Sequence, residues 1–281
     1  MNILLSNDDG FTSNVWALYD ALKDEGHDVI VSVPCTNQSG RGGSLVMYSS
    51  NLISAVNDAQ IASKGGCHNN VARIGDPAVG QVKWYGFTFR DFHYVHGTPV
   101  LATMYGLDVL AQERWGKRPD LVLSGPNEGQ NTGRIVNSSG TIGNVQFASA
   151  RGIPAIALSA GFDTVDDTTL RDPDSAIVAQ LTVKLLQELE AQAGGARLLP
   201  AGVSLNVNFP SAVALDSAWA SSRIGSFDRY QLKFNNTPGK YGYGASLNDP
   251  STATAAQADN ESVVVFGDNK ISVTAMQASF D

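Results

Sequence analysis

The residues with the clearest chemical potential stand near the start of the chain, where two carboxylates follow each other. Asp8 and Asp9 come directly after Ile3–Ser6, a short apolar run that predicts a buried strand. Two adjacent carboxylates resist ionising together unless a cation holds them, and ligands of open α/β sheets bind at strand ends. The pair therefore indicates a divalent-metal site. A polar turn with a helix cap at Asn7–Gly10 is an equally open interpretation.

Polar segments rich in glycine follow other predicted strands further along the chain. The first comes after strand 29–33, the second after strand 121–123, and a third lies directly before a predicted helix. Because loops after parallel strands project from one edge of a sheet, we expect these segments to converge on Asp8 and Asp9. The segments cover residues 37–44, 124–133 and 137–141.

The side chains that would meet there suit a hard cation beside a phosphate group. Oxygen ligands with few carboxylates favour Mg²⁺, Mn²⁺ or Ca²⁺. The helix start at 139–141 offers two hydroxyls, free N–H groups and the positive end of the helix dipole, which bind anions. We expect one divalent cation per subunit, Mg²⁺ or Mn²⁺, with Ca²⁺ as an alternative occupant. The expected ligands are Asp8, Asp9, Ser39 and Asn127, and Asn37 and Asn131 would donate to the anion.

Each of these segments also has a purely structural interpretation. Glycine-rich loops after strands are common turns, Ser139 or Thr141 could cap a helix, and Ser44 could serve only its turn. The four histidines share no ligand spacing, and neither a Gly-x-Ser-x-Gly elbow nor a Walker loop occurs. The sequence therefore argues against a serine hydrolase and an NTPase, and the metal site stays a hypothesis.

Composition restricts the partners. The 281 residues carry a net charge of −8 and a pI near 4.9, which disfavours a nucleic-acid polymer. A small phosphate ester stays compatible if a metal supplies local positive charge. No apolar run approaches the roughly 20 residues that cross a bilayer, so no membrane partner is expected. Met1 directly precedes the first strand, which makes the cytoplasm the default compartment. Removal of a signal peptide would instead indicate the periplasm or secretion.

The chain has two cysteines, Cys35 and Cys67, and they do not form a CxxC pair. A zinc site is therefore not expected. The two residues could form one disulfide in an oxidising compartment or remain buried thiols, and the sequence leaves both open.

Strand and helix patterns alternate through most of the chain, which predicts an α/β fold. Strands that alternate with helices form a mostly parallel sheet with helices on both faces. The predicted strands are 3–6, 29–33, 121–124, 155–159 and 203–209, and the predicted helices are 14–25, one opening at Pro99, 141–151 and 174–192.

Two regions break this alternation. Residues about 50–96 have weak periodicity and predict an insertion of loops and hairpins. Near the C-terminus, Gly267–Asn269 predicts a hairpin turn and 240–259 predicts a loop. We therefore expect a catalytic core over 1–222 and a hairpin extension with the final strands over 223–281. The strands expected in that extension are 229–234, 262–266 and 271–275.

Five motifs follow one another along residues 1–160. They are Ile3–Gly10, Asn37-x-Ser39-Gly40 with Ser44-Leu45, Gly97-Thr98-Pro99, Pro119–Gly133 and Ser139-Gly140-Thr141. Together these motifs resemble the stationary-phase survival protein SurE family, and a weaker similarity covers Asn269–Met276. Residues about 50–96 are longer than in compact members and look more like the extended acid-phosphatase relatives.

The resemblance implies a Rossmann-like core, a β-hairpin that exchanges between subunits to give a homodimer or homotetramer, and a divalent-metal-dependent phosphatase. By this resemblance Asp8 and Asp9 are the catalytic residues. The metal ligands correspond to Asp8, Asp9, Ser39 and Asn127, and the phosphate-side residues to Asn37, Ser44, Asn131, Ser139, Gly140 and Thr141.

The leading hypothesis is hydrolysis of nucleoside 5′-monophosphates or other phosphate monoesters, a 5′-nucleotidase or acid phosphatase activity. A metal-dependent nucleoside hydrolase is an alternative, although it would need further acidic ligands after later strands. A non-catalytic nucleotide- or sugar-binding module is a third hypothesis.

Overall fold

The computed structural model describes residues 1–45, 53–56, 67–164, 169–237 and 240–278. Its centre is a nine-stranded sheet in the order β3-β4-β2-β1-β5-β6-β7-β11-β8. Within the order β4-β2-β1-β5-β6-β7, every pair of adjacent strands is parallel. The bounds are β1 (Asn2–Ser6), β2 (Asp28–Pro34), β3 (Val79–Trp84), β4 (Phe87–Val95), β5 (Leu121–Glu128), β6 (Ala155–Ala160), β7 (Val203–Asn208), β8 (Trp219–Ser222) and β11 (Ile271–Gln277).

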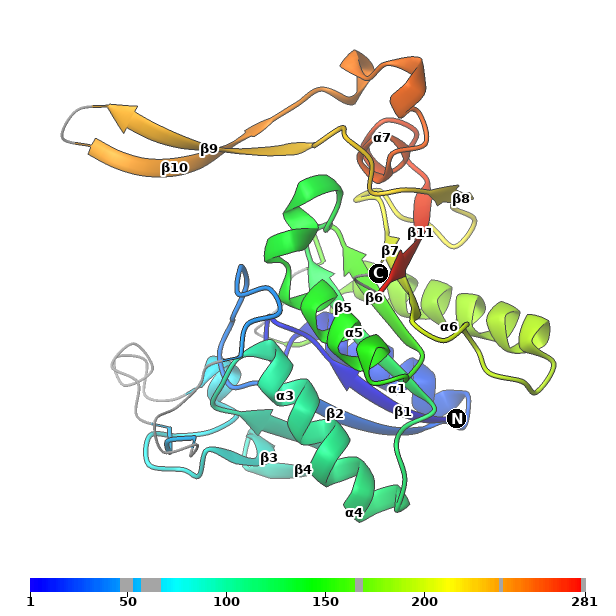
Figure 1. Ribbon diagram of the computed structural model, residues 1–281. Coiled ribbons are helices and arrows are strands. Elements are labelled where there is room, and N and C mark those ends of the chain that lie inside the picture. The colour runs from blue at the N-terminus through cyan, green and yellow to red at the C-terminus, as the bar shows by residue number, and fades with distance from the viewer. Residues whose placement is uncertain (46–52, 57–66, 165–168, 238–239, 279–281) are drawn as a thin grey trace.

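Helices cover both faces of this sheet, as the sequence predicts (Figure 1). On β1, Ile3 and Leu5 belong to one core cluster, while Leu4 between them belongs to the other. A strand buried on both faces must be apolar at every position rather than at alternate ones. The first face carries α1 (Ser13–Asp24) and α6 (Pro173–Ala193), and the second carries α3 (Pro99–Tyr105), a π-helical turn Gly106–Leu110, α4 (Ala111–Trp115) and α5 (Gly140–Ala150).

The segment predicted as an insertion contributes strands to the main sheet. β4 pairs in parallel with β2, and β3 pairs antiparallel with β4. Phe92 on β4 is buried against Phe11 and Trp16, with ring centroids 5.4 Å and 5.3 Å away. The aromatic residues that obscured the periodicity are thus the ones that attach this edge to the core. Residues 46–52 and 57–66 of the same segment lie outside the described residues.

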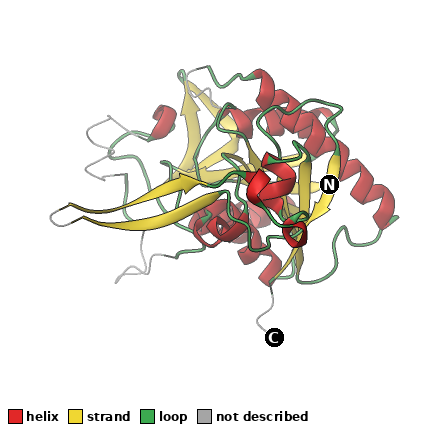
Figure 2. Cartoon of the chain, turned by 90° about the horizontal axis from the view of Figure 1, so that it is seen from above, coloured by secondary structure: helices red, strands yellow, loops and turns green. Residues whose placement is uncertain are grey.

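The C-terminal region holds a two-stranded hairpin of β9 (Tyr230–Thr237) and β10 (Lys240–Leu247). It extends away from the sheet in both views (Figures 1 and 2). The expected strand at 229–234 is confirmed as β9. The expectation of a loop from residue 240 is wrong over β10. Cross-strand pairing with β9 gives strand structure to a segment whose glycines and alanine have low strand propensity.

Two further C-terminal predictions are wrong. Residues 262–266 form α7 (Glu261–Phe266) rather than a strand. Consequently Gly267–Asn269 is not a hairpin turn but leads from this helix into β11. That final strand pairs antiparallel with β7 and parallel with β8. Val264 and Val265 of α7 are buried, so tertiary packing overrides their β propensity.

None of the helices in the described part of the chain combines the length and apolar character needed to cross a membrane.

Candidate active site

Asp8 and Asp9 follow the C-terminal end of β1, in the middle of the sheet, and each is only 2 % exposed. The turn closes through a hydrogen bond from Gly10 N to Asn7 Oδ1 over 3.0 Å. Gly10 has a φ of 95°, a conformation that a side chain would strain. The turn therefore holds two adjacent carboxylates at the sheet edge.

Asp9 is held by groups from two neighbouring loops. Asn37 Nδ2 and Ser39 Oγ donate to Asp9 Oδ1 over 3.0 Å and 2.7 Å. The backbone N–H of Glu128, at the end of β5, donates to Asp9 Oδ2 over 3.0 Å. Asn37 also accepts a hydrogen bond from Ser39 N through its Oδ1. The expected convergence of the loops after β2 and β5 on Asp9 is thus present.

Asp8 faces the start of α5. Thr141 Oγ1 lies 2.6 Å from Asp8 Oδ1 and 3.0 Å from Asn127 Oδ1. Gly140 packs so closely that a Cβ there would lie 2.6 Å from Asp8 Cβ. Only glycine allows the helix start to approach the carboxylate this closely. One hydroxyl therefore links a carboxylate oxygen to the amide oxygen expected as a metal ligand.

The electrostatics of Asp8 follow from this burial. Loss of solvent, together with repulsion from Asp9, raises the pKa of Asp8 well above its ordinary value, and the Thr141 hydrogen bond opposes that rise. Two buried carboxylates in contact with the same loops are costly to keep charged without a cation.

These side chains border a cavity of about 200 Å³ at the sheet edge. Of the residues predicted from sequence, Asp8, Ser39, Asn127, Asn131 and Ser139 line it directly. Asn37 and Thr141 lie behind this lining, in contact with Asp9 and Asp8 respectively. The remaining described lining residues are Gly40, Glu128, Gly129, Gln130, Ile135, Ser138, Phe162 and Tyr230.

Two predicted residues behave differently from the rest. Ser139 is the N-cap of α5, and its Oγ accepts a hydrogen bond from Ile142 N over 3.3 Å. The prediction that Ser139 caps a helix is therefore confirmed. Ser139 also borders the cavity. Ser44 is exposed and is not among the described residues that line the cavity. The assignment of Ser44 to the group of residues that would surround the phosphate stays a prediction.

Asn131 is fixed by a buried polar network that sequence reasoning missed. Asn208 Oδ1 accepts from Asn131 N over 2.8 Å, and Asn206 Nδ2 donates to Asn131 O over 3.0 Å. Asn206 Nδ2 also lies 2.7 Å from Glu261 Oε1, and Ser262 Oγ donates to Thr132 Oγ1 over 2.8 Å. The sequence did contain a sign of this network, because β7 is a buried strand with asparagine at two alternate positions. Buried strands of parallel sheets are usually apolar throughout.

The donor set fits a hard cation. Within the described residues, no group of three histidine, cysteine or acidic side chains could hold a metal. The candidate ligands instead comprise two carboxylates, one hydroxyl and one amide oxygen, and Mg²⁺ and Mn²⁺ accept such ligands together with water.

A disulfide lies just before the loop that contacts Asp9. Cys35 and Cys67 are bonded, with their Cα atoms 5.2 Å apart, which resolves the choice that the sequence left open. Cys35 lies two residues before Asn37, so the bridge anchors the start of the loop that reaches Asp9.

The chain is similar over most of its length to proteins of one family. The family model described as Survival protein SurE matches residues 3–229. The chain belongs to the SurE family. It is 32% identical over 269 residues to an acid phosphatase of Yarrowia lipolytica, which covers 89% of this chain and 71% of that protein. It is also 31% identical to a 5′-nucleotidase SurE of Desulfovibrio desulfuricans, over 78% of this chain and 69% of that protein.

The fold comparison points to the same family. The SurE protein of Aquifex aeolicus superposes with a TM-score of 0.70 at 25% identity, covering 100% of this chain and 95% of that one. SurE membership and the named relatives support a phosphatase function for this chain.

Proposed function

We propose that this SurE-family protein is a divalent-metal-dependent phosphomonoesterase that hydrolyses nucleoside 5′-monophosphates or related phosphate monoesters. The observation that carries the proposal is the contact of Asp8 and Asn127 with Thr141, at the start of α5, beside one cavity. The carboxylates suit a cation and the helix start suits an anion, which are the two requirements of phosphoryl transfer.

The cation would be held by Asp8, Asp9, Ser39 and Asn127. When bound, it supplies the Lewis acidity that polarises a phosphoryl oxygen and lowers the pKa of a water molecule. Ser39 can serve as a ligand through an oxygen lone pair while its O–H donates a hydrogen bond to Asp9 Oδ1. The hydrogen bonds from Asn37 and the Glu128 N–H to Asp9 orient that carboxylate before any ligand arrives.

The phosphate would lie against the start of α5, where Ser139, Gly140 and Thr141 present the positive end of the helix dipole. Charge that builds on the phosphoryl oxygens is stabilised best by donors that are already in place. Asn131 meets this condition, because Asn206 and Asn208 fix its backbone and its Nδ2 donates to Ser159 Oγ over 3.0 Å.

The test uses the purified protein with AMP and either Mg²⁺ or Mn²⁺, followed by addition of EDTA. Release of inorganic phosphate that stops with EDTA and returns with added metal is the expected result. Free adenine would identify a nucleoside hydrolase instead. No phosphate release from AMP or from a generic ester, p-nitrophenyl phosphate, would identify a passive binding module. Either of those outcomes would contradict the proposal.

We also propose that the protein forms a homodimer or homotetramer through the β9–β10 hairpin. The hairpin extends away from the sheet (Figure 2). It exposes four large apolar side chains, at Leu232, Phe234, Tyr243 and Leu247. Grouped exposed apolar residues of this kind mark association surfaces. Sedimentation analysis of the double variant Phe234→Glu, Tyr243→Glu should show a smaller species than the wild type, and equal sedimentation would contradict the assignment.

A further inference from the structure

An exposed aromatic ring stands at the mouth of the candidate active site. Phe162 follows β6 and is 64% exposed, yet it lines the same cavity as Asp8 and Asn127. Tyr230, at the start of β9, lines that cavity too. The two ring centroids lie 6.4 Å apart with an interplanar angle of 89°, so the rings form a corner rather than a stack.

Both rings are supported by residues around them. The Tyr230 ring packs edge-on against Phe266, with centroids 5.8 Å apart, and the Arg229 guanidinium lies 5.4 Å from the centre of the Phe266 ring. The Phe162 ring lies against Gly129, where any Cβ would overlap it. Gly129 directly follows β5 and stands two residues after Asn127, so the position of Phe162 is tied to the segment that would hold the cation.

Cavity size indicates where the rest of a substrate must lie. About 200 Å³ is less than the 300–1,000 Å³ typical of sites that enclose a small molecule. The cavity can therefore enclose the phosphate end of an ester, while a larger leaving group must extend through the mouth. Phe162 and Tyr230 stand at that exit.

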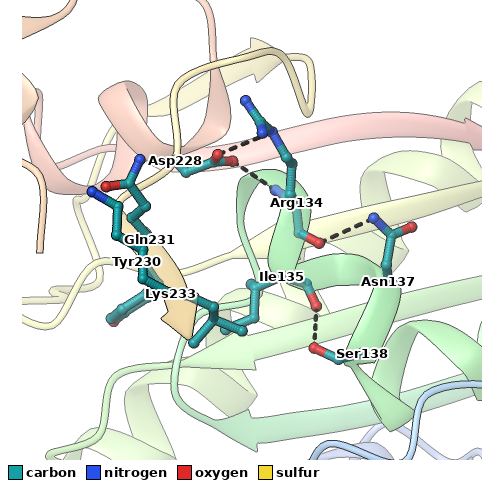
Figure 3. Close-up of a pocket in the computed structure, with 9 residues that line it drawn as sticks. Arg134, Ile135, Asn137, Ser138, Asp228, Tyr230, Gln231 and Lys233 are labelled. Atoms are coloured by element: carbon teal, nitrogen blue, oxygen red, sulfur yellow. Dashed lines mark hydrogen bonds and ion pairs between the residues drawn. The ribbon is translucent and has the colours of Figure 1, made fainter. Parts of the chain in front are cut away.

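A second cavity, of about 420 Å³, adjoins this one, and Figure 3 shows residues that line it. It shares Ile135, Ser138 and Tyr230 with the catalytic cavity. On its rim Arg134 is ion-paired with Asp228 over 3.0 Å, so this arginine is already neutralised by a carboxylate. Lys233 also lines the second cavity, but the three shared residues are one apolar, one aromatic and one hydroxyl side chain. The shared wall therefore carries no cationic side chain, which suits a flat ring better than a second phosphate.

We propose that Phe162 and Tyr230 form an aromatic subsite that binds a planar ring carried by the leaving group. These two residues would make the protein favour phosphate esters whose alcohol bears a ring system over esters of simple sugars or polyols. The inference rests on the proposed phosphomonoesterase activity and adds a specificity determinant to it. Because ring stacking forms before the reaction and persists through it, its effect should appear in KM more than in kcat.

AMP and ribose 5-phosphate provide the test, because they share the same phosphate ester and differ by the base. We would measure kcat/KM for both with Mg²⁺ and compare the AMP to ribose 5-phosphate ratio among variants. Phe162→Ala and Phe162→Leu should each lower the ratio about tenfold, the size of one lost stacking contact. Phe162→Tyr and Tyr230→Phe should keep the ratio, whereas Tyr230→Leu should lower it.

Phe87→Ala is the matched control, because Phe87 is 71% exposed on β4 at the other side of the sheet. Its ratio should equal that of the wild type. If Phe162→Leu matches Phe162→Tyr, or if the ratio is unchanged in every variant of an active enzyme, the aromatic subsite is refuted while the phosphatase assignment stands. If the wild type releases phosphate from neither ester, the proposed function fails and the subsite fails with it.

Discussion

Thr141 Oγ1 lies 2.6 Å from Asp8 Oδ1, although 133 residues separate the two in sequence. This contact joins the end of β1 to the start of α5 across one edge of the sheet. It brings a carboxylate that suits a cation next to a helix start that suits a phosphate. The same hydroxyl lies 3.0 Å from Asn127 Oδ1, so Thr141 touches two of the candidate ligands.

Replacing Thr141 by valine should therefore weaken metal activation. The substitution keeps the shape and removes a hydrogen bond to a buried charged group, a contribution of about 1.5–3 kcal/mol. We expect the Mg²⁺ concentration for half-maximal phosphate release to rise about tenfold or more. Thr141→Ser keeps the hydroxyl and should stay near the wild type. A valine variant with unchanged metal activation would contradict the role assigned to this hydroxyl.

Removal of the disulfide should lower stability. The bridge closes a loop between residues 32 apart, and in the chain-entropy account such a loop constrains the unfolded state by about 4 kcal/mol. The double variant Cys35→Ala, Cys67→Ala should lose roughly that free energy of unfolding in urea. Reduction of the wild type with dithiothreitol should reproduce the loss, and the reductant should not affect the double variant. Equal urea concentrations at the unfolding midpoint for the oxidised and the reduced protein would refute the prediction.

Glu261 should make stability depend on pH in the direction opposite to that of a salt-bridged carboxylate. Burial raises the pKa of Glu261 from 4.5 to about 7. The folded protein therefore binds the Glu261 carboxyl proton more tightly than the unfolded chain does. The free energy of unfolding gains from this proton below pH 4.5, and the gain is lost as the pH rises to 7. A pKa shift of this size corresponds to a loss of about 3 kcal/mol in the free energy of unfolding.

Glu261→Gln removes this titration while keeping the shape of the side chain. The wild type minus variant difference in the free energy of unfolding should fall as pH rises from 4.5 to 7. A difference that is constant over this window would contradict the raised pKa.

Most of the site could be predicted because its residues lie in local motifs at strand ends. Asp8, Asp9, Ser39 and Asn127 follow strands that apolar patterns reveal, and parallel pairing brings those ends together. The aromatic corner could not be predicted in this way. Phe162 is a single exposed residue in the segment after β6, which no sequence motif marks. Its ring contact with Tyr230 depends on the direction in which the hairpin leaves the core.

The C-terminal errors have a shared cause. Val263–Val265 have β propensity, but they lie in α7, where the neighbouring Glu261 and Ser262 contact Asn206 and Thr132. These partners are distant in sequence, so no local pattern could reveal them. Propensity is a weak guide wherever tertiary contacts of this kind decide the conformation.

The most direct test of the central claim is phosphate release from AMP by Asp8→Asn in saturating Mg²⁺, with thermal unfolding measured in parallel. This substitution keeps the size of the side chain and removes its charge. We predict that the folded variant loses nearly all activity. A folded Asp8→Asn protein that retains most of the wild-type rate would contradict the assignment of this carboxylate to the catalytic centre.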